Sequence, residues 1–203
     1  MDIDAIMARA PVIPVLVIED LAHALPIARA LVAGGLSVLE VTLRTPCALE
    51  AIRAMKQVEG AIVGAGTVLN PRDLDAALEA GSEFIVSPGL TEPLGKAAIA
   101  SGVPFLPGTA TAGDVMRGLD LGLNRFKFFP AMAAGGPPAL KAMASVFGSV
   151  RFCPTGGITL ATAPDWLAID AVACVGGSWM VPKGEPNPLA IEQAARAAGE
   201  LTR

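Results

Sequence analysis

The sequence predicts an α/β protein with the architecture of a compact (β/α)8 TIM barrel. Two observations carry this prediction. Short apolar runs rich in β-branched residues alternate with Ala- and Leu-rich amphipathic segments, in about eight units of about 25 residues each. The predicted strands are apolar along nearly their whole length, which is typical of a parallel sheet that helices cover.

The elements are delimited by these patterns and by local start and stop signals. The predicted strands span residues 13–18, 37–43, 61–65, 84–86, 104–106, 125–128, 150–153 and 171–175. The predicted helices span residues 21–33, 48–58, 71–80, 93–100, 112–121, 138–147 and 160–167. Asn70 and Pro71 supply the N-cap and the first residue of one helix, which Gly81 ends, while Gly102 and the pair Gly34-Gly35 end others.

An open doubly wound sheet is the alternative for the same alternation of strands and helices. Its first strand usually leads into a G-x-G-x-x-G turn that receives a phosphate group. In this chain the first predicted strand is followed by Glu19, Asp20 and Leu21, with no glycine. The closed barrel is therefore the better prediction.

Composition bounds the class of protein. Of 203 residues, 53% are hydrophobic and 17% are charged, and the mean hydropathy is +0.56, which together exclude intrinsic disorder. The length fits one domain over residues 1–203. The net charge is −4 and no stretch concentrates Lys or Arg, so no nucleic-acid partner is expected.

The N-terminal segment and the cysteines bear on location. Two Asp precede the first Arg, and the longest apolar run there, residues 12–18, is too short to cross a bilayer, so neither a signal peptide nor a membrane partner is expected. Cys47, Cys153 and Cys174 lack the spacing of a disulfide or metal pair. We expect three buried free thiols in a reduced, cytoplasmic setting.

Glu40, Thr42 and Arg44 alternate along the second predicted strand and therefore share one face. Their apolar neighbours would face the helices, so the polar face is directed into the barrel mouth, where such enzymes place their active sites. A Glu inside an apolar strand is costly unless it is paired or functional. The alternative is a frayed strand end where Glu40 and Arg44 form a solvated ion pair.

Lys127 lies between Phe126 and Phe128 in the predicted strand over residues 125–128. The two aromatic rings should pack outward against helices, which directs Lys127 inward. Because desolvation disfavours an ammonium ion, an inward lysine is a candidate nucleophilic amine. The alternative is a lysine whose stem follows the core while its ammonium group reaches water.

Two glycine pairs indicate a phosphate site. Gly156-Gly157 follows the seventh predicted strand beside Thr155, and Gly176-Gly177 follows the eighth beside Ser178. In barrel enzymes the loops after these two strands commonly bind phosphate through backbone N–H groups. One such pair alone would usually be a turn. A further tight turn with a hydroxyl group is predicted over residues 64–67.

Metal chemistry is not expected. The single histidine, His23, is predicted to be an ordinary residue early in the first helix, because zinc and iron sites normally need several His or Cys ligands. The chain has no tyrosine, so acid–base chemistry is left to Glu40, a water molecule or the substrate.

Six segments, in matching order along the chain, resemble the 2-keto-3-deoxy-6-phosphogluconate (KDPG) aldolases, some of which also cleave 4-hydroxy-2-oxoglutarate. They span residues 39–45, 64–71, 84–91, 126–130, 152–158 and 176–179. The resemblance extends from Val12 to Pro182. It implies a compact, homotrimeric (β/α)8 barrel that needs neither metal nor cofactor and forms a Schiff base with a small keto-acid phosphate.

The resemblance also implies a role for each candidate residue. Lys127 matches the Schiff-base lysine and Glu40 the general acid/base. The substrate-binding positions match Arg44 and Thr67 for the carboxylate, Gly156, Gly157 and Ser178 for the phosphate, and Pro88, Phe129 and Thr155 for the pocket wall. At Thr155 the chain resembles the phosphogluconate branch of the family, since the phosphogalactonate aldolases tend to have Val at this position.

One position departs from the pattern. Some relatives have an Arg near the end of the first strand, whereas this chain has Val15-Leu16-Val17. Phosphate binding is then expected to depend on backbone N–H groups and Ser178.

The implied reaction is cleavage of KDPG to pyruvate and glyceraldehyde 3-phosphate, with cleavage of 4-hydroxy-2-oxoglutarate to pyruvate and glyoxylate as a second activity. On the residues alone, two other classes stay open. An isomerase or epimerase acting on a sugar phosphate would explain the glycine pairs but would give Lys127 no covalent role. In a non-catalytic module that binds a phosphorylated metabolite, Lys127 and Glu40 would be incidental.

Overall fold

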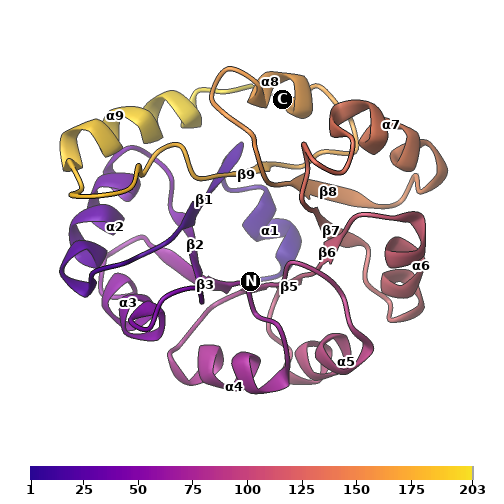
Figure 1. Cartoon of the computed structure of the whole chain (residues 1–203), viewed down its shortest axis with the longest axis horizontal. Helices are drawn as coiled ribbons and strands as arrows, with labels where there is room; N and C mark the ends of the chain where they lie inside the picture. Colours follow the sequence, from indigo (N-terminus) through magenta and orange to yellow (C-terminus); the bar gives the residue numbers. More distant parts are fainter. Residues whose placement is uncertain (203) are drawn as a thin grey trace.

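The computed structural model describes residues 1–202 as an α/β fold in which parallel strands curl around the centre and helices lie outside them (Figure 1). The strands are β1 Val12–Leu16, β2 Val38–Thr42, β3 Ile62–Gly66, β4 Ile85–Val86, β5 Phe105–Leu106, β6 Gly108–Thr109, β7 Arg125–Phe128, β8 Arg151–Pro154 and β9 Val175–Gly177. The helices are α1 Ile3–Met7, the 3-10 turn η1 Leu21–His23, α2 Ala24–Ala33, α3 Ala48–Met55, α4 Pro71–Glu79, α5 Glu92–Ser101, α6 Ala112–Asp120, α7 Gly136–Val146, α8 Ala163–Leu167 and α9 Pro188–Gly199.

The strands form two parallel sheets. One has the order β5-β4-β3-β2-β1-β9 and the other the order β6-β7-β8. Only Pro107 separates β5 from β6, and an isolated parallel bridge joins Thr155, just after β8, to Gly176 in β9. Because neighbouring strands run in the same direction, their carboxyl ends meet at one end of the molecule.

Each predicted strand and helix overlaps an element of the structure, and the differences are local. The pattern over residues 21–33 begins as η1, so His23 ends a 3-10 turn and does not lie within a regular helix. Of the predicted strand over residues 171–175, only Val175 belongs to β9, while Val172 makes an isolated bridge to Phe152. Two helices, α1 and α9, have no counterpart in the prediction.

The prediction of a tight turn over residues 64–67 is wrong. Strand β3 continues to Gly66, and only Thr67 leaves the strand conformation, with a φ of 59°. A Cβ atom at Gly64 would lie 2.5 Å from the ring of Phe84, and one at Gly66 would lie 2.2 Å from Oε1 of Glu40. Close approach of neighbouring side chains, and not chain reversal, requires glycine at both positions.

The main core lies between the strands and the outer helices. Phe126 and Phe128 are fully buried in it, and the ring of Phe128 lies 6.3 Å from that of Trp166 in α8, centroid to centroid. This confirms that the two Phe side chains of β7 point outward. By the alternation of a strand, Lys127 then points inward.

A second, smaller core fills the space inside the curled strands. Ile6 and Met7 of α1 are 1% exposed and pack with inward side chains such as Val38 and Leu106. Burying two such side chains stabilises the fold by about 1.5–3 kcal/mol each. Arg125, the first residue of β7, forms an ion pair with Asp4, so α1 is held at the amino ends of the strands. The carboxyl ends stay available for a site.

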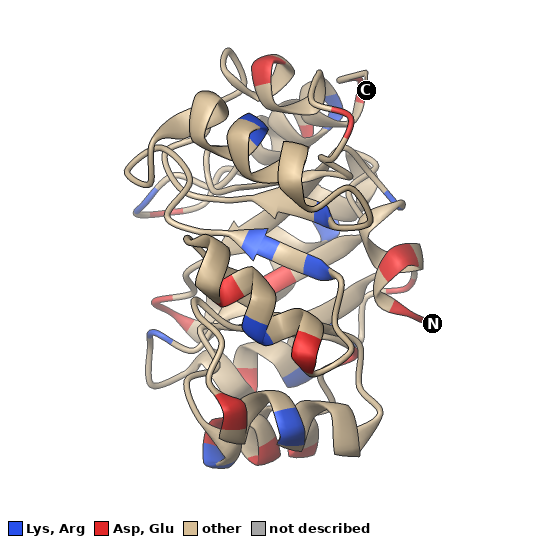
Figure 2. Cartoon of the chain, turned by 90° about the vertical axis from the view of Figure 1, so that its right-hand side faces the viewer, with Lys and Arg blue, Asp and Glu red and all other residues tan. Residues whose placement is uncertain are grey.

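Helix ends follow the local signals. The Asn70 side chain accepts a hydrogen bond from the Asp73 N–H at 3.1 Å, and Gly102 closes α5 in the left-handed conformation at φ 72°. Asp114 and Thr111 form a reciprocal capping box at the start of α6. Figure 2 shows acidic and basic residues interspersed over the helices and loops of that side of the molecule.

The remaining sequence expectations are met in part. Cys153 and Cys174 are buried as expected, whereas Cys47 is only half-buried and its thiol donates to the Ile18 carbonyl at 3.1 Å. Within residues 1–202, no helix has both the length and the apolar character needed to cross a bilayer.

Candidate active site

Lys127 and Glu40 meet inside the curled sheet. Nζ of Lys127 donates to Oε1 of Glu40 at 2.9 Å and lies 3.4 Å from Oε2, and the two side chains are 7% and 4% exposed. Their strands, β7 and β2, are not neighbours, so the pair is formed across the interior. The inward direction predicted for both side chains is confirmed, and the lysine with its ammonium group in water is excluded.

The surroundings of the pair hold it in place. Gly66 leaves room for the Glu40 carboxylate, and Gly108, which lies beside Lys127 in the sheet, brings β6 against the Pro88 carbonyl. Nζ of Lys127 also lies 5.5 Å from the centre of the Phe129 ring, over its face. Removal of either charge from such a buried pair would leave the other uncompensated. The carboxylate can accept a proton from the ammonium group and so release a neutral, nucleophilic amine.

Arg44 and Thr67 lie together at the carboxyl ends of β2 and β3. The Arg44 Nε donates to the Thr67 hydroxyl at 3.3 Å, and the guanidinium group is otherwise exposed. Arg44 therefore does not form the solvated pair with Glu40 that was the alternative. Thr67 has a left-handed backbone, which costs a residue with a Cβ atom about 1–2 kcal/mol. Strain of this kind tends to persist where a site needs it.

Thr42 has a structural contact. Its hydroxyl donates to the Leu16 carbonyl in the neighbouring strand at 2.8 Å, and the side chain is fully buried. Of the three polar residues predicted to share a face of β2, Thr42 is thus the one that fastens β2 to β1.

The loops at the ends of β8 and β9 approach each other, since Thr155 and Gly176 form a parallel bridge. The pair Gly156-Gly157 lies in the first of these loops, but the pair Gly176-Gly177, predicted to follow a strand, lies within β9 itself. Gly156 and Gly157 have φ angles of 111° and 76°, a conformation that favours glycine. Within residues 1–202, neither N–H group of this pair donates to a protein acceptor, and the Ser178 hydroxyl is exposed beside them. Neutral donors of this kind can bind an anion.

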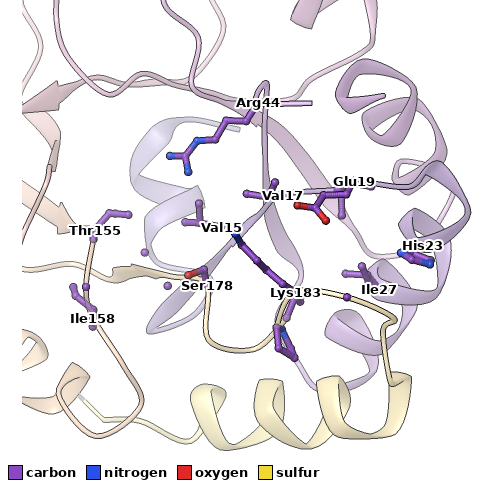
Figure 3. A pocket seen from close by; sticks show the side chains of 18 of the residues that line it. Val15, Val17, Glu19, His23, Ile27, Arg44, Thr155, Ile158, Ser178 and Lys183 are labelled. Carbon is purple, nitrogen blue, oxygen red and sulfur yellow. The ribbon is translucent and has the colours of Figure 1, made fainter. Parts of the chain in front are cut away.

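A cavity of about 740 Å³ opens at these loops (Figure 3). Its wall includes six of the predicted residues, Arg44, Phe129, Thr155, Gly156, Gly157 and Ser178. Lys127, Glu40, Thr67 and Pro88 are not part of this wall. The ring of Phe129 connects the two regions, because it lines the cavity and also lies against Lys127.

Sequence reasoning missed several residues of this cavity. Glu19, Asp20, His23, Lys183 and Glu185 line it, and His23 Nε2 lies 3.3 Å from Glu185 Oε2. His23, expected to be an ordinary surface or helix-face residue, is half-buried at the end of η1 and borders the cavity. These residues lie on loops, where no periodicity indicates the direction of a side chain.

Metal ligation finds no support in the geometry of the described chain. Among residues 1–202, no three His, Cys, Asp or Glu side chains lie close enough together to hold a metal ion.

A buried lysine–carboxylate pair beside a cavity with a guanidinium group and a cluster of free N–H groups suits lysine-dependent chemistry on a small anionic molecule. The family model described as "KDPG and KHG aldolase" matches residues 3–194. The chain belongs to this family. It is an aldolase, that is, a lyase that breaks a carbon–carbon bond.

Close relatives agree with this assignment. The chain is 65% identical over 202 residues to the 2-dehydro-3-deoxy-phosphogluconate aldolase of Zymomonas mobilis, covering 100% of this chain and 97% of the relative. The crystal structure of the KDPG aldolase of Z. mobilis with 3-phosphoglycerate has a TM-score of 0.99 to this chain, with 65% identity and coverage of 100% and 97%. That of the Legionella pneumophila KDPG aldolase, with pyruvate captured as a covalent carbinolamine, has a TM-score of 0.95, 46% identity and coverage of 98% and 99%.

Proposed function

We propose that this protein cleaves KDPG to pyruvate and glyceraldehyde 3-phosphate through a Schiff base on Lys127. One observation carries the proposal: Lys127 and the Glu40 carboxylate are hydrogen-bonded at 2.9 Å in the buried interior of the curled sheet, next to a cavity that can hold a small anion. A lysine in this position has a partner that accepts its proton and almost no water to solvate its charge.

The first half of the reaction forms the covalent adduct. Glu40 accepts a proton from the Lys127 ammonium group, and the free amine attacks the C2 carbonyl carbon of the keto acid. Glu40 returns its proton to the hydroxyl group of the resulting carbinolamine, which leaves as water and gives an iminium cation. Arg44 and Thr67 bind the adjacent carboxylate, which fixes the carbonyl beside the amine and removes much of the entropic cost of the encounter.

The second half breaks the C3–C4 bond. Glu40, through a water molecule, takes the proton of the C4 hydroxyl group, and the bonding electrons move to the iminium to form an enamine as glyceraldehyde 3-phosphate leaves. The enamine is protonated at C3, and hydrolysis of the iminium releases pyruvate and restores the amine. Positioned acid–base catalysis of this kind contributes about 10²–10⁴-fold.

The pocket beyond the reacting carbons would bind the half of the substrate that leaves as the aldehyde. In the proposal, Pro88, Phe129 and Thr155 surround the bond that breaks, and Gly156, Gly157 and Ser178 bind the phosphate group of the leaving aldehyde. Since the carboxylate end does not depend on the phosphate, 4-hydroxy-2-oxoglutarate is the second proposed substrate, giving pyruvate and glyoxylate. The name of the family, which joins KDPG with KHG (4-hydroxy-2-oxoglutarate), supports this.

We further infer that the two sheets form one closed eight-stranded barrel in a single domain over the described residues 1–202. The single residue between β5 and β6 supports counting them as one strand, and the bridge between Thr155 and Gly176 supports closure between β8 and β9. The resemblance to the family further suggests a homotrimer that works in the cytoplasm without a cofactor.

The test is covalent trapping. Incubation with pyruvate and borohydride, followed by intact mass measurement, should add one reduced pyruvate to the wild-type chain. Peptide mapping should place it on Lys127. Lys127→Ala and Lys127→Arg should lose trapping and cleavage together, because a guanidinium group stays protonated and is no nucleophile. Lys141→Ala, at an exposed position of α7, is the control and should behave as wild type.

The trapping experiment distinguishes an aldolase from the other two classes of protein that the residues alone leave open. An isomerase, an epimerase or a binding module gains no covalent pyruvate. Specific trapping on another residue of Lys127→Ala, with cleavage intact, would overturn the mechanism.

A further inference from the structure

The phosphate end of the proposed site has a shortage of positive charge. Gly156, Gly157 and Ser178 offer only neutral donors, whereas a phosphate monoester carries about −1.5 to −2 charges at neutral pH. Transfer of such a charge out of water is costly unless it is compensated, and hydrogen bonds from a charged donor are about twice as strong as neutral ones. A cation that reaches these loops would complete the site.

The cavity wall offers few candidates for that cation. Among its described residues, the lysine and arginine side chains are those of Lys183 and Arg44. Arg44 follows β2 and is hydrogen-bonded to Thr67 at the carboxylate end of the proposed site. Lys183 follows β9, on the same connection as Ser178, and lines the same cavity as Gly156 and Gly157. It is therefore the cation of this wall that is left for the phosphate end.

The direction of the Lys183 side chain fits this role. Its backbone lies on the outer loop, yet Figure 3 shows the side chain running into the cavity, toward Val15. Val15 and Val17 of the first strand and the turn after it form an apolar part of the wall. An apolar wall can hold the aliphatic stem of a lysine while the ammonium group stays in the wet cavity.

The carboxylates of the cavity are partly occupied by other partners. Glu185 is paired with His23, and this pair links the loop of Lys183 to η1. The Asp20 carboxylate accepts from the Ala22 N–H at 2.8 Å. Glu19 is the remaining acid on the wall, so an entering phosphate dianion has one main competitor for the ammonium group.

We propose that Lys183 is the cation that recognises the phosphate group of the substrate and so sets the preference for phosphorylated over unphosphorylated keto acids. The inference rests on the proposed aldolase function and assigns a specificity-determining residue to its site.

The experiment compares two substrates that differ only in the phosphate, KDPG and 2-keto-3-deoxygluconate. Lys183→Met removes the charge and keeps an unbranched stem. It should lower kcat/KM for KDPG about tenfold, mainly through KM, as expected for the loss of a hydrogen bond between charged groups. The value for 2-keto-3-deoxygluconate should not change. Lys183→Arg should restore most of the loss, and Lys141→Met is the matched control.

A binding measurement keeps the test independent of catalysis. Calorimetry with glycerol 3-phosphate, against glycerol as the uncharged probe, should show weaker binding of the phosphate by Lys183→Met and a flatter dependence on salt. If KDPG turnover and phosphate binding are unchanged in Lys183→Met, or if both substrates lose equally, the inference is wrong. If wild type binds the phosphate through Lys183 but traps no pyruvate, the proposed function fails and the assignment of Lys183 stands.

Discussion

The two ends of the site are built in opposite ways. At one end, Lys127 and Glu40 are buried side chains on β7 and β2 that meet across the interior at 2.9 Å. At the other end, Gly156, Gly157 and Ser178 present backbone N–H groups and a hydroxyl on exposed loops. The first end depends on two particular functional groups, and the second on a shape of the main chain.

This difference has a consequence for how each end responds to change. A buried charged pair has no substitute, because its surroundings were formed around both charges. A main-chain anion site is shared among several donors, so the loss of one side chain removes only part of the binding. Mutations at the first end should therefore change chemistry by orders of magnitude, and those at the second should change affinity for one part of the substrate.

The largest effect is expected at the buried end. Glu40→Gln keeps the shape of the side chain but cannot accept a proton, so kcat for KDPG should fall about 10²–10⁴-fold. Slow pyruvate trapping should survive, because the amine is still present. Proton exchange at the methyl group of pyruvate, followed by NMR, should fall in parallel because it passes through the same enamine. Retention of fast exchange would remove Glu40 from the proton-transfer step.

A positional change at the same end should have a smaller but still large effect. In Gly66→Ala the new methyl group would collide with the Glu40 carboxylate, which must move. A displacement on the order of 1 Å in a catalytic group can cost about 10²-fold in rate. We expect lower kcat with a folded chain, verified by circular dichroism. Gly113→Ala is the control, since a Cβ atom there has space. Wild-type kcat in Gly66→Ala would show that the position of Glu40 is not critical.

The exposed end should respond weakly and selectively. Ser178→Ala removes a hydroxyl group that we propose donates to the phosphate group, so kcat/KM for KDPG should fall about tenfold. Cleavage of 4-hydroxy-2-oxoglutarate, which has no phosphate group, should stay at the wild-type rate in a coupled pyruvate assay. Equal losses on both substrates would place Ser178 outside the phosphate site.

The smallest effect is expected away from both ends, at the capping box of α6. Burial raises the pKa of Asp114, but hydrogen bonds from the Ala110 and Thr111 N–H groups, the Thr111 hydroxyl and Arg117 outweigh it and hold the pKa below its ordinary value. Because its pKa is lowered, the ionised Asp114 carboxylate stabilises the fold at pH values above the ordinary pKa of an Asp. This contribution is lost as the pH falls through the lowered pKa.

Asp114→Asn should therefore reduce the free energy of unfolding by about 1 kcal/mol at neutral pH. The difference from wild type should shrink below about pH 4, and kcat/KM should not change. Urea unfolding at several pH values measures this. A constant difference down to the acid range would contradict the assignment to the ionised carboxylate.

Much of the fold is predictable because its signals are local. The alternation of apolar runs and amphipathic segments gives the order of strands and helices, and Asn70 and Gly102 mark helix ends through their own backbone preferences. The helix α1 escapes this reasoning because it is short and gains its stability from being enclosed by the strands. No periodicity within five residues indicates such a partner.

The candidate site also has a part that local signals predict and a part that they do not. The alternation of residues along a strand is enough to direct Glu40 and Lys127 inward, and the resemblance to the KDPG aldolases gives them roles. By itself, the sequence thus determined the alternating architecture and the inward direction of these two side chains, because both depend on neighbours in the chain.

Only the tertiary structure decided which groups meet. The register of β2, β3 and β7 brings the Lys127 amine to Glu40 and sets Gly66 against the carboxylate. The packing of loops turns Lys183 into the cavity and pairs His23 with Glu185. These contacts join residues far apart in the chain, so their geometry is set by the packing of the whole molecule and not by any local pattern.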